Sequence, residues 1–179
     1  SDALMNVSAI GLKFANELYD ELNAKEDVPV AFLNASWGGT GITTWLSREY
    51  IDKDAIVSEK FKKYGIYPVH EKWNTAGDLN FQQTCSQYNY KIAPLLGMKF
   101  RGVIWYQGEN NVGNNVQYEP LFKGLINNWR EIWGNNFPFY FVQLAGYQQP
   151  VEVQPGSQWA ALRWAQQKAL ELDNTGMAT

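Results

Sequence analysis

Three runs of apolar residues lack the polar alternation of a half-exposed strand, and they predict buried β-strands at 28–34, 101–106 and 138–144. β-Branched and aromatic residues, which favour strands, dominate these runs. A further run of this kind starts at Met177 and consists of the last three residues of the sequence. The pattern therefore predicts three complete buried strands and the beginning of a fourth.

Between these runs, apolar residues recur at helical spacing. We expect helices at about 8–24, 54–64, 87–96, Asn114 or Asn115 to Trp133, and 158–172. In the first helix the apolar stripe consists of Ile10, Phe14, Leu18 and Leu22. Ser157 is a suitable N-cap for the last helix, and Gly134 a suitable stop for the long one.

Helices that separate buried strands indicate βαβ units and a parallel sheet. We therefore predict a single α/β domain over residues 1–179, built as a three-layer α/β/α sandwich. Residues 65–86 show no regular pattern. A loop of this length is unusual inside a compact domain and is more often functional than idle.

Polar side chains follow the strand 101–106 immediately. Gln107, Glu109, Asn110 and Asn111 stand around a glycine at its carboxyl end. In open α/β sheets, ligands bind just beyond the carboxyl ends of the strands, so these side chains are candidates for a site. A polar loop that merely closes the strand explains the same residues equally well.

A glycine-rich turn, Asn34-Ala35-Ser36-Trp37-Gly38-Gly39-Thr40-Gly41, follows the strand 28–34. Exposed backbone N–H groups in such a turn can bind a phosphate or a developing oxyanion. No Gly-Lys-Ser/Thr follows, and the spacing is not that of a dinucleotide-binding fingerprint. A tight strand-to-helix turn that needs glycine for steric reasons is the simpler reading.

Composition narrows the function classes. The net charge is −3 and no basic run occurs, which argues against a nucleic-acid binder. No apolar stretch is long enough to span a membrane. One cysteine, Cys85, and one histidine, His70, exclude an internal disulfide and a multi-histidine metal site, so we expect neither metal nor cofactor. Aromatic residues make up 15% of the sequence and include eight Trp. This content suits either a sugar-handling protein or a protein with a large core.

The pairing of Asn34-Ala35-Ser36-Trp37-Gly38-Gly39-Thr40 with Gly102-Val103-Ile104-Trp105-Tyr106-Gln107-Gly108-Glu109-Asn110-Asn111 resembles the sialate O-acetylesterase family, a branch of the SGNH (GDSL-like) hydrolases. Three flanking segments, 8–18, 88–95 and 159–178, also resemble the family in the right order. Residues 53–84 match least. The resemblance implies a flavodoxin-like parallel sheet.

The resemblance also implies a serine esterase that removes acetyl groups from sugar hydroxyls, with an acetylated carbohydrate as its partner. Such an enzyme needs a serine nucleophile and a histidine base oriented by an aspartate. In the family these lie in a G-Q-S-N-type motif upstream and a D-x-x-H motif downstream, and neither motif occurs here. We therefore expect a segment of a longer parent, truncated at both ends. The family is often secreted or periplasmic, but the sequence assigns no compartment.

The family's oxyanion donors map onto the backbone N–H of Gly38 or Gly39 and onto Gln107 or Asn110. Other SGNH enzymes use a Gly-x-Asn at the second place, which Asn110 matches. Sialate esterases usually have a small residue there, which favours Gln107. Trp37, Glu109 and Asn111 are candidates for substrate binding, since an ionised Glu109 cannot stabilise an oxyanion.

Within this sequence, the candidates for the nucleophile and the base are weak. Ser36 lacks the preceding glycine of G-x-S-x-G, and its hydroxyl is expected to bond the turn backbone. His70 has no acidic partner at a recognisable spacing. Other function classes are a non-catalytic sugar-binding module that uses tryptophans such as Trp37 and Trp73, and a glycosidase that uses Glu109 with a carboxylate such as Asp78.

The order of the strands also bears on association. If residues 28–34 form an exposed edge of the sheet, their unpaired N–H and C=O groups are a template for another chain. We therefore expect the isolated chain to self-associate through that edge.

Overall fold

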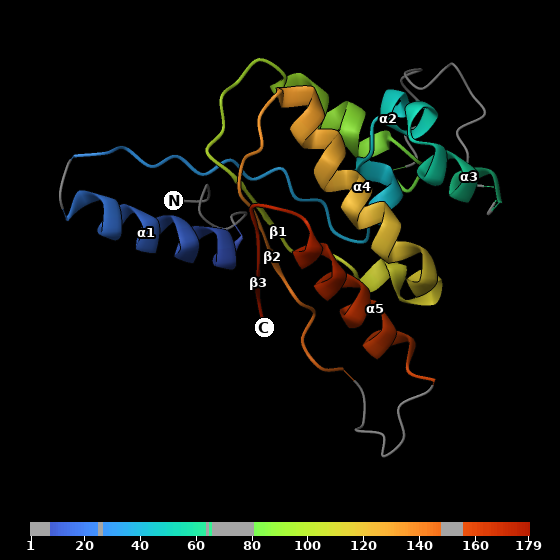
Figure 1. Cartoon of the computed structure of the whole chain (residues 1–179). Coiled ribbons are helices and arrows are strands. Elements are labelled where there is room, and N and C mark those ends of the chain that lie inside the picture. Colours follow the sequence, from blue (N-terminus) through green and yellow to red (C-terminus); the bar gives the residue numbers. More distant parts are fainter. Residues whose placement is uncertain (1–7, 25–26, 64, 66–80, 148–155) are drawn as a thin grey trace. The chain divides into compact units, whose positions relative to one another are not determined.

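The computed structural model describes residues 8–24, 27–63, 65, 81–147 and 156–179 (Figure 1). The chain divides into two compact units, residues 1–38 and residues 39–179. The first carries one helix, and the second carries the sheet and the remaining helices of the described residues.

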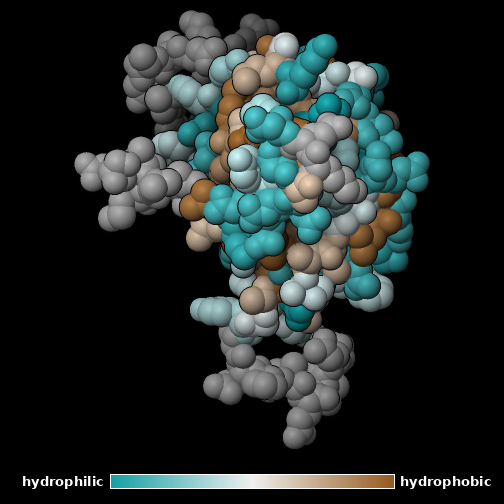
Figure 2. Space-filling view, turned by 90° about the vertical axis from the view of Figure 1, so that its left-hand side faces the viewer, coloured by the Kyte–Doolittle hydropathy of each residue, from teal (hydrophilic) through white to brown (hydrophobic). Residues whose placement is uncertain are grey.

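In the first unit, α1 spans Ala9–Asn23, close to the predicted 8–24. Ser8 caps it by accepting a hydrogen bond from the N–H of Gly11. The predicted apolar stripe is only partly covered, since Ile10, Phe14, Leu18 and Leu22 are 37–45% exposed. Apolar residues accordingly lie among hydrophilic ones on the face that Figure 2 shows.

The predicted strand 28–34 is wrong. Residues 27–36 form no strand, and Leu33 is 45% exposed. An apolar run becomes a strand only when a neighbouring strand supplies partners for its N–H and C=O groups, and this segment pairs with none of the described strands. Pro29 also lacks an N–H donor. The expected self-association edge is therefore not part of the sheet.

The other strand predictions are confirmed. β1 (Val103–Trp105), β2 (Phe139–Val142) and β3 (Thr175–Ala178) form a parallel sheet in that order. Trp105 lies opposite Phe141, and Phe141 opposite Met177, so the three carboxyl ends share one edge. The fold belongs to the α/β class, as the sequence predicts.

The long helix α4 spans Asn115–Trp133 and packs on one face of this sheet. Its Phe122 ring lies 6.3 Å from Trp105, 6.0 Å from Phe139 and 5.1 Å from Phe141, measured between ring centroids. Gly134 ends the helix in the left-handed conformation, which glycine adopts without steric cost. The helix 114–133 and its terminator are therefore confirmed.

The helix predicted at 54–64 is α3 (Ala55–Lys63), and a helix that was not predicted, α2 (Arg48–Lys53), precedes it. The helices predicted at 87–96 and 158–172 are present, but each is divided into two elements. Asp54 separates α2 from α3 because its carboxylate accepts the N–H groups of Ile56 and Val57 and starts a new helix. Ser157 caps α5, as predicted, by accepting the N–H of Ala160. The remaining helical elements are η2 (Ile42–Trp45), α2 (Arg48–Lys53), α3 (Ala55–Lys63), η3 (Tyr88–Ile92), η4 (Ala93–Leu95), η5 (Glu109–Asn114), α5 (Gln158–Gln167) and η6 (Lys168–Glu171).

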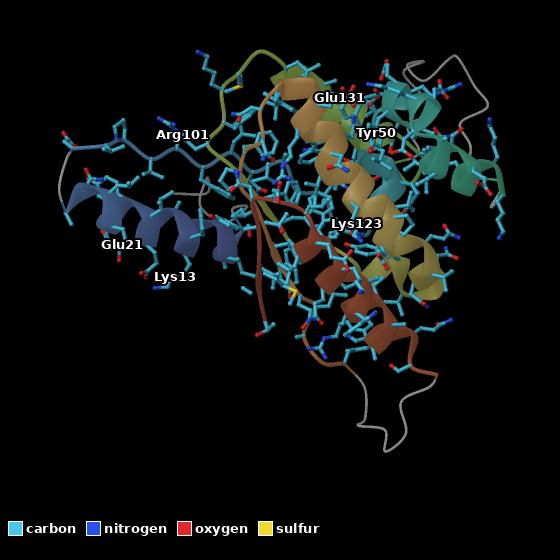
Figure 3. All side chains as sticks on the ribbon, in the orientation of Figure 1. Lys13, Glu21, Tyr50, Arg101, Lys123 and Glu131 are labelled. Carbon is cyan, nitrogen blue, oxygen red and sulfur yellow. The ribbon has the colours of Figure 1, made fainter. Side chains whose placement is uncertain are left out.

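Side-chain contacts from α4 hold the neighbouring elements in place. Lys123, labelled in Figure 3, forms ion pairs with Glu119 at 2.7 Å and with Glu171 of η6 at 2.8 Å. On another side of the helix, Asn128 is 1% exposed, accepts the N–H of Ser47 at 2.9 Å and donates to its hydroxyl at 3.0 Å. Asn128 therefore anchors the segment that leads from η2 into α2.

We expect Asn128→Ala to lower the free energy of unfolding by about 1–3 kcal/mol, because the buried N–H of Ser47 loses its acceptor. Urea denaturation of both proteins measures the difference. Asn127→Ala is the matched control, since Asn127 is exposed on the same helix and the substitution changes helix propensity equally. Equal losses for the two variants would contradict the anchoring role of Asn128.

Candidate functional site

The candidate site begins where the chain leaves the carboxyl end of β1 (Figure 1). Gln107 follows the strand directly, and η5 starts at Glu109. Gly108 between them is buried against Leu144 and Leu162. The chain therefore turns sharply at the strand end and presents Glu109 and Asn110, which are both exposed.

Gln107 is the centre of a hydrogen-bond network. Its side-chain nitrogen donates to the carbonyl of Thr40 at 3.0 Å and to Oδ1 of Asn111 at 2.7 Å. The Tyr118 hydroxyl lies 3.0 Å from both the backbone oxygen and the side-chain oxygen of Gln107. Burial raises the pKa of Tyr118 far above its ordinary value, so this hydroxyl keeps its proton in any ordinary buffer. The hydrogen bonds to Thr40 and Asn111 thus engage both amide protons of Gln107 within the protein.

Asn111 joins the same network from the other side. It is buried, and its Oδ1 also accepts the N–H of Ile42 at 3.0 Å. Residues 40–42 are thereby held against the polar segment after β1, although about 70 residues separate them along the chain. The contacts of Asn111 are those of a positioning residue.

Asn110 differs from its neighbours because it is exposed. Its amide nitrogen donates to Oε1 of Gln82 at 3.2 Å, and Nε2 of Gln82 donates in turn to the carbonyl of Gly39. An asparagine amide carries two protons, and this hydrogen bond uses one of them. Gln82 thus connects Asn110 with the glycine-rich turn.

Sequence reasoning did not single out Gln82. It lies in the irregular segment 65–86, whose length alone pointed to function. Gln166, 0% exposed on α5, was missed as well: it donates to the carbonyl of Gln107 at 3.1 Å and accepts the N–H of Leu144 at 3.0 Å. It therefore ties the ends of β1 and β2 together. A glutamine on a helix gives no signal of this in the sequence.

The other candidate residues are placed as follows. Trp37, 49% exposed, and Gly38 belong to the first unit, whereas Gly39 belongs to the second. Ser36 donates its hydroxyl to Oδ1 of Asn34 at 2.6 Å, so it bonds a side chain rather than the backbone that we expected. His70, Trp73 and Asp78 lie outside the described residues.

Two further findings concern metals and membranes. Within the described ranges, no group of three or more His, Cys, Asp or Glu side chains is placed to hold a metal ion. Of the helices described, none is long and apolar enough to cross a membrane.

We expect Gly108→Ala to destabilise the protein by about 1–3 kcal/mol, because small-to-large changes in a packed core force neighbours apart. A methyl group at Gly108 would stand 2.9 Å from Leu162 Cδ2 and 3.2 Å from Leu144 Cδ1. Thermal unfolding measures the effect. Gly113→Ala is the control, since no atom lies within 4 Å of a methyl group there. An unchanged melting temperature for Gly108→Ala would show that the strand end is loosely packed.

Comparison with known proteins identifies the family. The model of carbohydrate esterases described as sialic acid-specific acetylesterases matches residues 3–179. Sialate O-acetylesterase of Mus musculus is 32% identical in an alignment 165 residues long that covers 79% of this chain and 30% of the mouse protein. The Homo sapiens protein is 30% identical in an alignment 148 residues long that covers 78% of this chain and 25% of the human one.

A crystal structure of a carbohydrate acetylesterase from Xanthomonas citri agrees with this fold at a TM-score of 0.72 and 33% identity. It covers 95% of this chain, which matches 33% of that protein. The chain thus spans a third or less of the length of these relatives. The resemblance deduced from the motifs is confirmed: the chain belongs to the carbohydrate esterase family of sialic acid-specific acetylesterases.

Proposed function

We propose that this chain is part of a carbohydrate O-acetylesterase that hydrolyses acetyl esters on sugar hydroxyls. Family membership supports the reaction class. The observation that carries the proposal for this chain is the connection of Asn110, through Gln82, to the glycine-rich turn. Gln82 thus joins the amide of Asn110 to the carbonyl of Gly39 beside one strand end, which supports an oxyanion site built from Asn110 and a glycine N–H.

The oxyanion donor must have an N–H group that the folded protein does not already use. Gln107 commits both of its amide protons, to Thr40 and to Asn111. Asn110 is exposed and its hydrogen bond to Gln82 takes one of its two protons. We therefore assign the donor to Asn110, with the backbone N–H of Gly39 as its companion, and give Gln107 and Asn111 positioning roles.

During the reaction a serine oxygen attacks the acetyl carbonyl, and the carbonyl oxygen becomes negatively charged. Asn110 and the glycine N–H stabilise that charge, while the catalytic base takes the serine proton and passes it to the sugar oxygen as that oxygen leaves. Water then hydrolyses the acetyl-serine ester, which releases acetate and restores the serine. Glu109 is exposed beside Asn110 and suits a hydrogen bond to a sugar hydroxyl. Trp37, half exposed, suits contact with the sugar ring.

The serine nucleophile and the His/Asp pair of this proposal come from outside residues 1–179. Ser36 is a poor nucleophile candidate because its hydroxyl donates to Asn34. Self-association of the chain also stays a proposal, without the sheet edge at 28–34 that the sequence suggested.

The isolated 179-residue chain is expected to show no esterase turnover above the assay background. Without the triad, a hydrolase retains roughly 10³-fold acceleration over water, which a standard acetate-release assay barely detects. The natural polypeptide that contains this chain should release acetate from O-acetylated sialic acid. Vigorous hydrolysis by the isolated chain that Ser36→Ala abolishes would instead make Ser36 the nucleophile. Sugar binding by the natural polypeptide without acetate release would favour the binding module.

In the natural polypeptide, we expect Asn110→Ala to lower kcat by about 10²–10³-fold with little change in KM, because the amide contacts the oxyanion only as charge develops. Gln82→Ala should lower kcat less, since it positions Asn110. Asn114→Ala is the matched control, an exposed asparagine of the same helix η5. An unchanged kcat in Asn110→Ala would contradict the assignment of Asn110 as the oxyanion donor, while the release of acetate would still support the esterase activity.

A further inference from the structure

An exposed tyrosine in the segment that follows β2 packs against a partly buried tryptophan of α5. Tyr147 is 65% exposed, and its ring centroid lies 4.9 Å from that of Trp159 at an interplanar angle of 38°. Trp159 stands in the first turn of α5. The exposed Tyr147 ring is therefore backed by the Trp159 ring, and the pair comes from two separate elements. We call it the Tyr147–Trp159 platform.

Hydrogen bonds hold this platform in place. The indole nitrogen of Trp159 donates to the carbonyl of Ala145 at 2.8 Å, and Ser157 caps the helix that carries Trp159. The polar edge of the indole is thereby satisfied within the protein. What the platform offers to a ligand is ring surface rather than a hydrogen-bond donor.

The platform borders the candidate site. Leu144, next to Ala145, donates its N–H to Gln166, and Gln166 donates to the carbonyl of Gln107. Since β1 and β2 are parallel and in register, both segments leave the sheet at the same edge. Figure 1 shows this edge, with the start of α5 beside it at the lower end of the molecule. Asn110 and Tyr147 therefore belong to segments that follow two neighbouring strand ends.

An exposed tryptophan elsewhere on α5 provides a contrast. Trp164, on the same helix, is 60% exposed, but the Lys168 ammonium lies 5.4 Å from its ring centroid. Its ring is therefore engaged in a cation–π contact. Trp164 shares helix and residue type with Trp159 and differs from it in its surroundings, which makes it a matched control.

We propose that the Tyr147–Trp159 platform is a subsite that stacks a neutral pyranose ring of the glycan, next to the ring that carries the acetyl group. This inference rests on the proposed function for the identity of the ligand. The C–H groups on one face of a galactopyranose ring form an apolar surface that fits an aromatic ring. A rigid aromatic surface binds it at little conformational cost, and the pair adds no charge that would favour an anionic ring.

The experiment titrates the 179-residue chain with lactose, following ring-proton signals by saturation-transfer NMR and the dissociation constant by intrinsic fluorescence. Unaltered protein should bind lactose with a millimolar dissociation constant. Tyr147→Ala should weaken binding about fivefold, the range expected of one aromatic contact. Tyr147→Phe should restore it because the ring remains. Trp164→Ala, measured by NMR, should leave binding unchanged.

Absence of lactose binding by the unaltered chain, or equal affinities for Tyr147→Ala and the unaltered chain, would overturn the subsite. Trp159→Phe keeps a ring but loses the bond to Ala145, so weaker binding with an unchanged melting temperature would support the platform's fixed orientation. The proposed function fails separately, if the natural polypeptide releases no acetate while lactose still binds. Acetate release with a KM unaffected by Tyr147→Ala would reject the subsite alone.

Discussion

The candidate site depends on one half-buried amide, the side chain of Gln107. Its two N–H groups bridge the carbonyl of Thr40 and the side chain of Asn111, and Tyr118 and Gln166 hold its backbone carbonyl. An amide that loses part of its hydrogen bonds away from water costs more than it contributes, so the network is stable only when these segments come together. The requirement fixes residues 40–42 beside the end of β1.

In this arrangement some polar side chains are buried and hold the neighbouring segments in position, whereas others are exposed to solvent. The buried residues Asn111 and Gln166 spend their polar atoms on the protein itself. Asn110 and Glu109 stand on the same short helix but face solvent. Reactive geometry in an enzyme needs such support, because an exposed side chain without a braced backbone does not keep its orientation.

Packing of aromatic residues in the core supports the end of β1, from which this network starts. Trp105 ends β1 and packs against Phe122 and Trp129 of α4, with ring centroids 6.3 and 5.8 Å apart. The high aromatic content, which suited either a core or a sugar site, therefore serves the core in large part. Tyr147 is an exception, since it stays exposed near the carboxyl edge of the sheet.

The sequence by itself determined the features that depend on neighbouring residues and on periodicity: the strands at 101–106 and 138–144, the helix that Gly134 ends, and the cap at Ser157. The sequence also identified the family, because the family's motifs and their order along the chain can be recognised without a structure. Local patterns suffice for these, since burial on one helix face or within one strand follows from spacing.

Only the tertiary structure decided which amides are engaged and which segments pair. Residues 28–34 read as a buried strand, yet a strand exists only with a partner, and the pattern of one segment does not supply it. Gln107 and Asn110 are alike as amides in the sequence. Their difference arises from Thr40 and Gln82, contacts across 67 and 28 residues that no local spacing encodes.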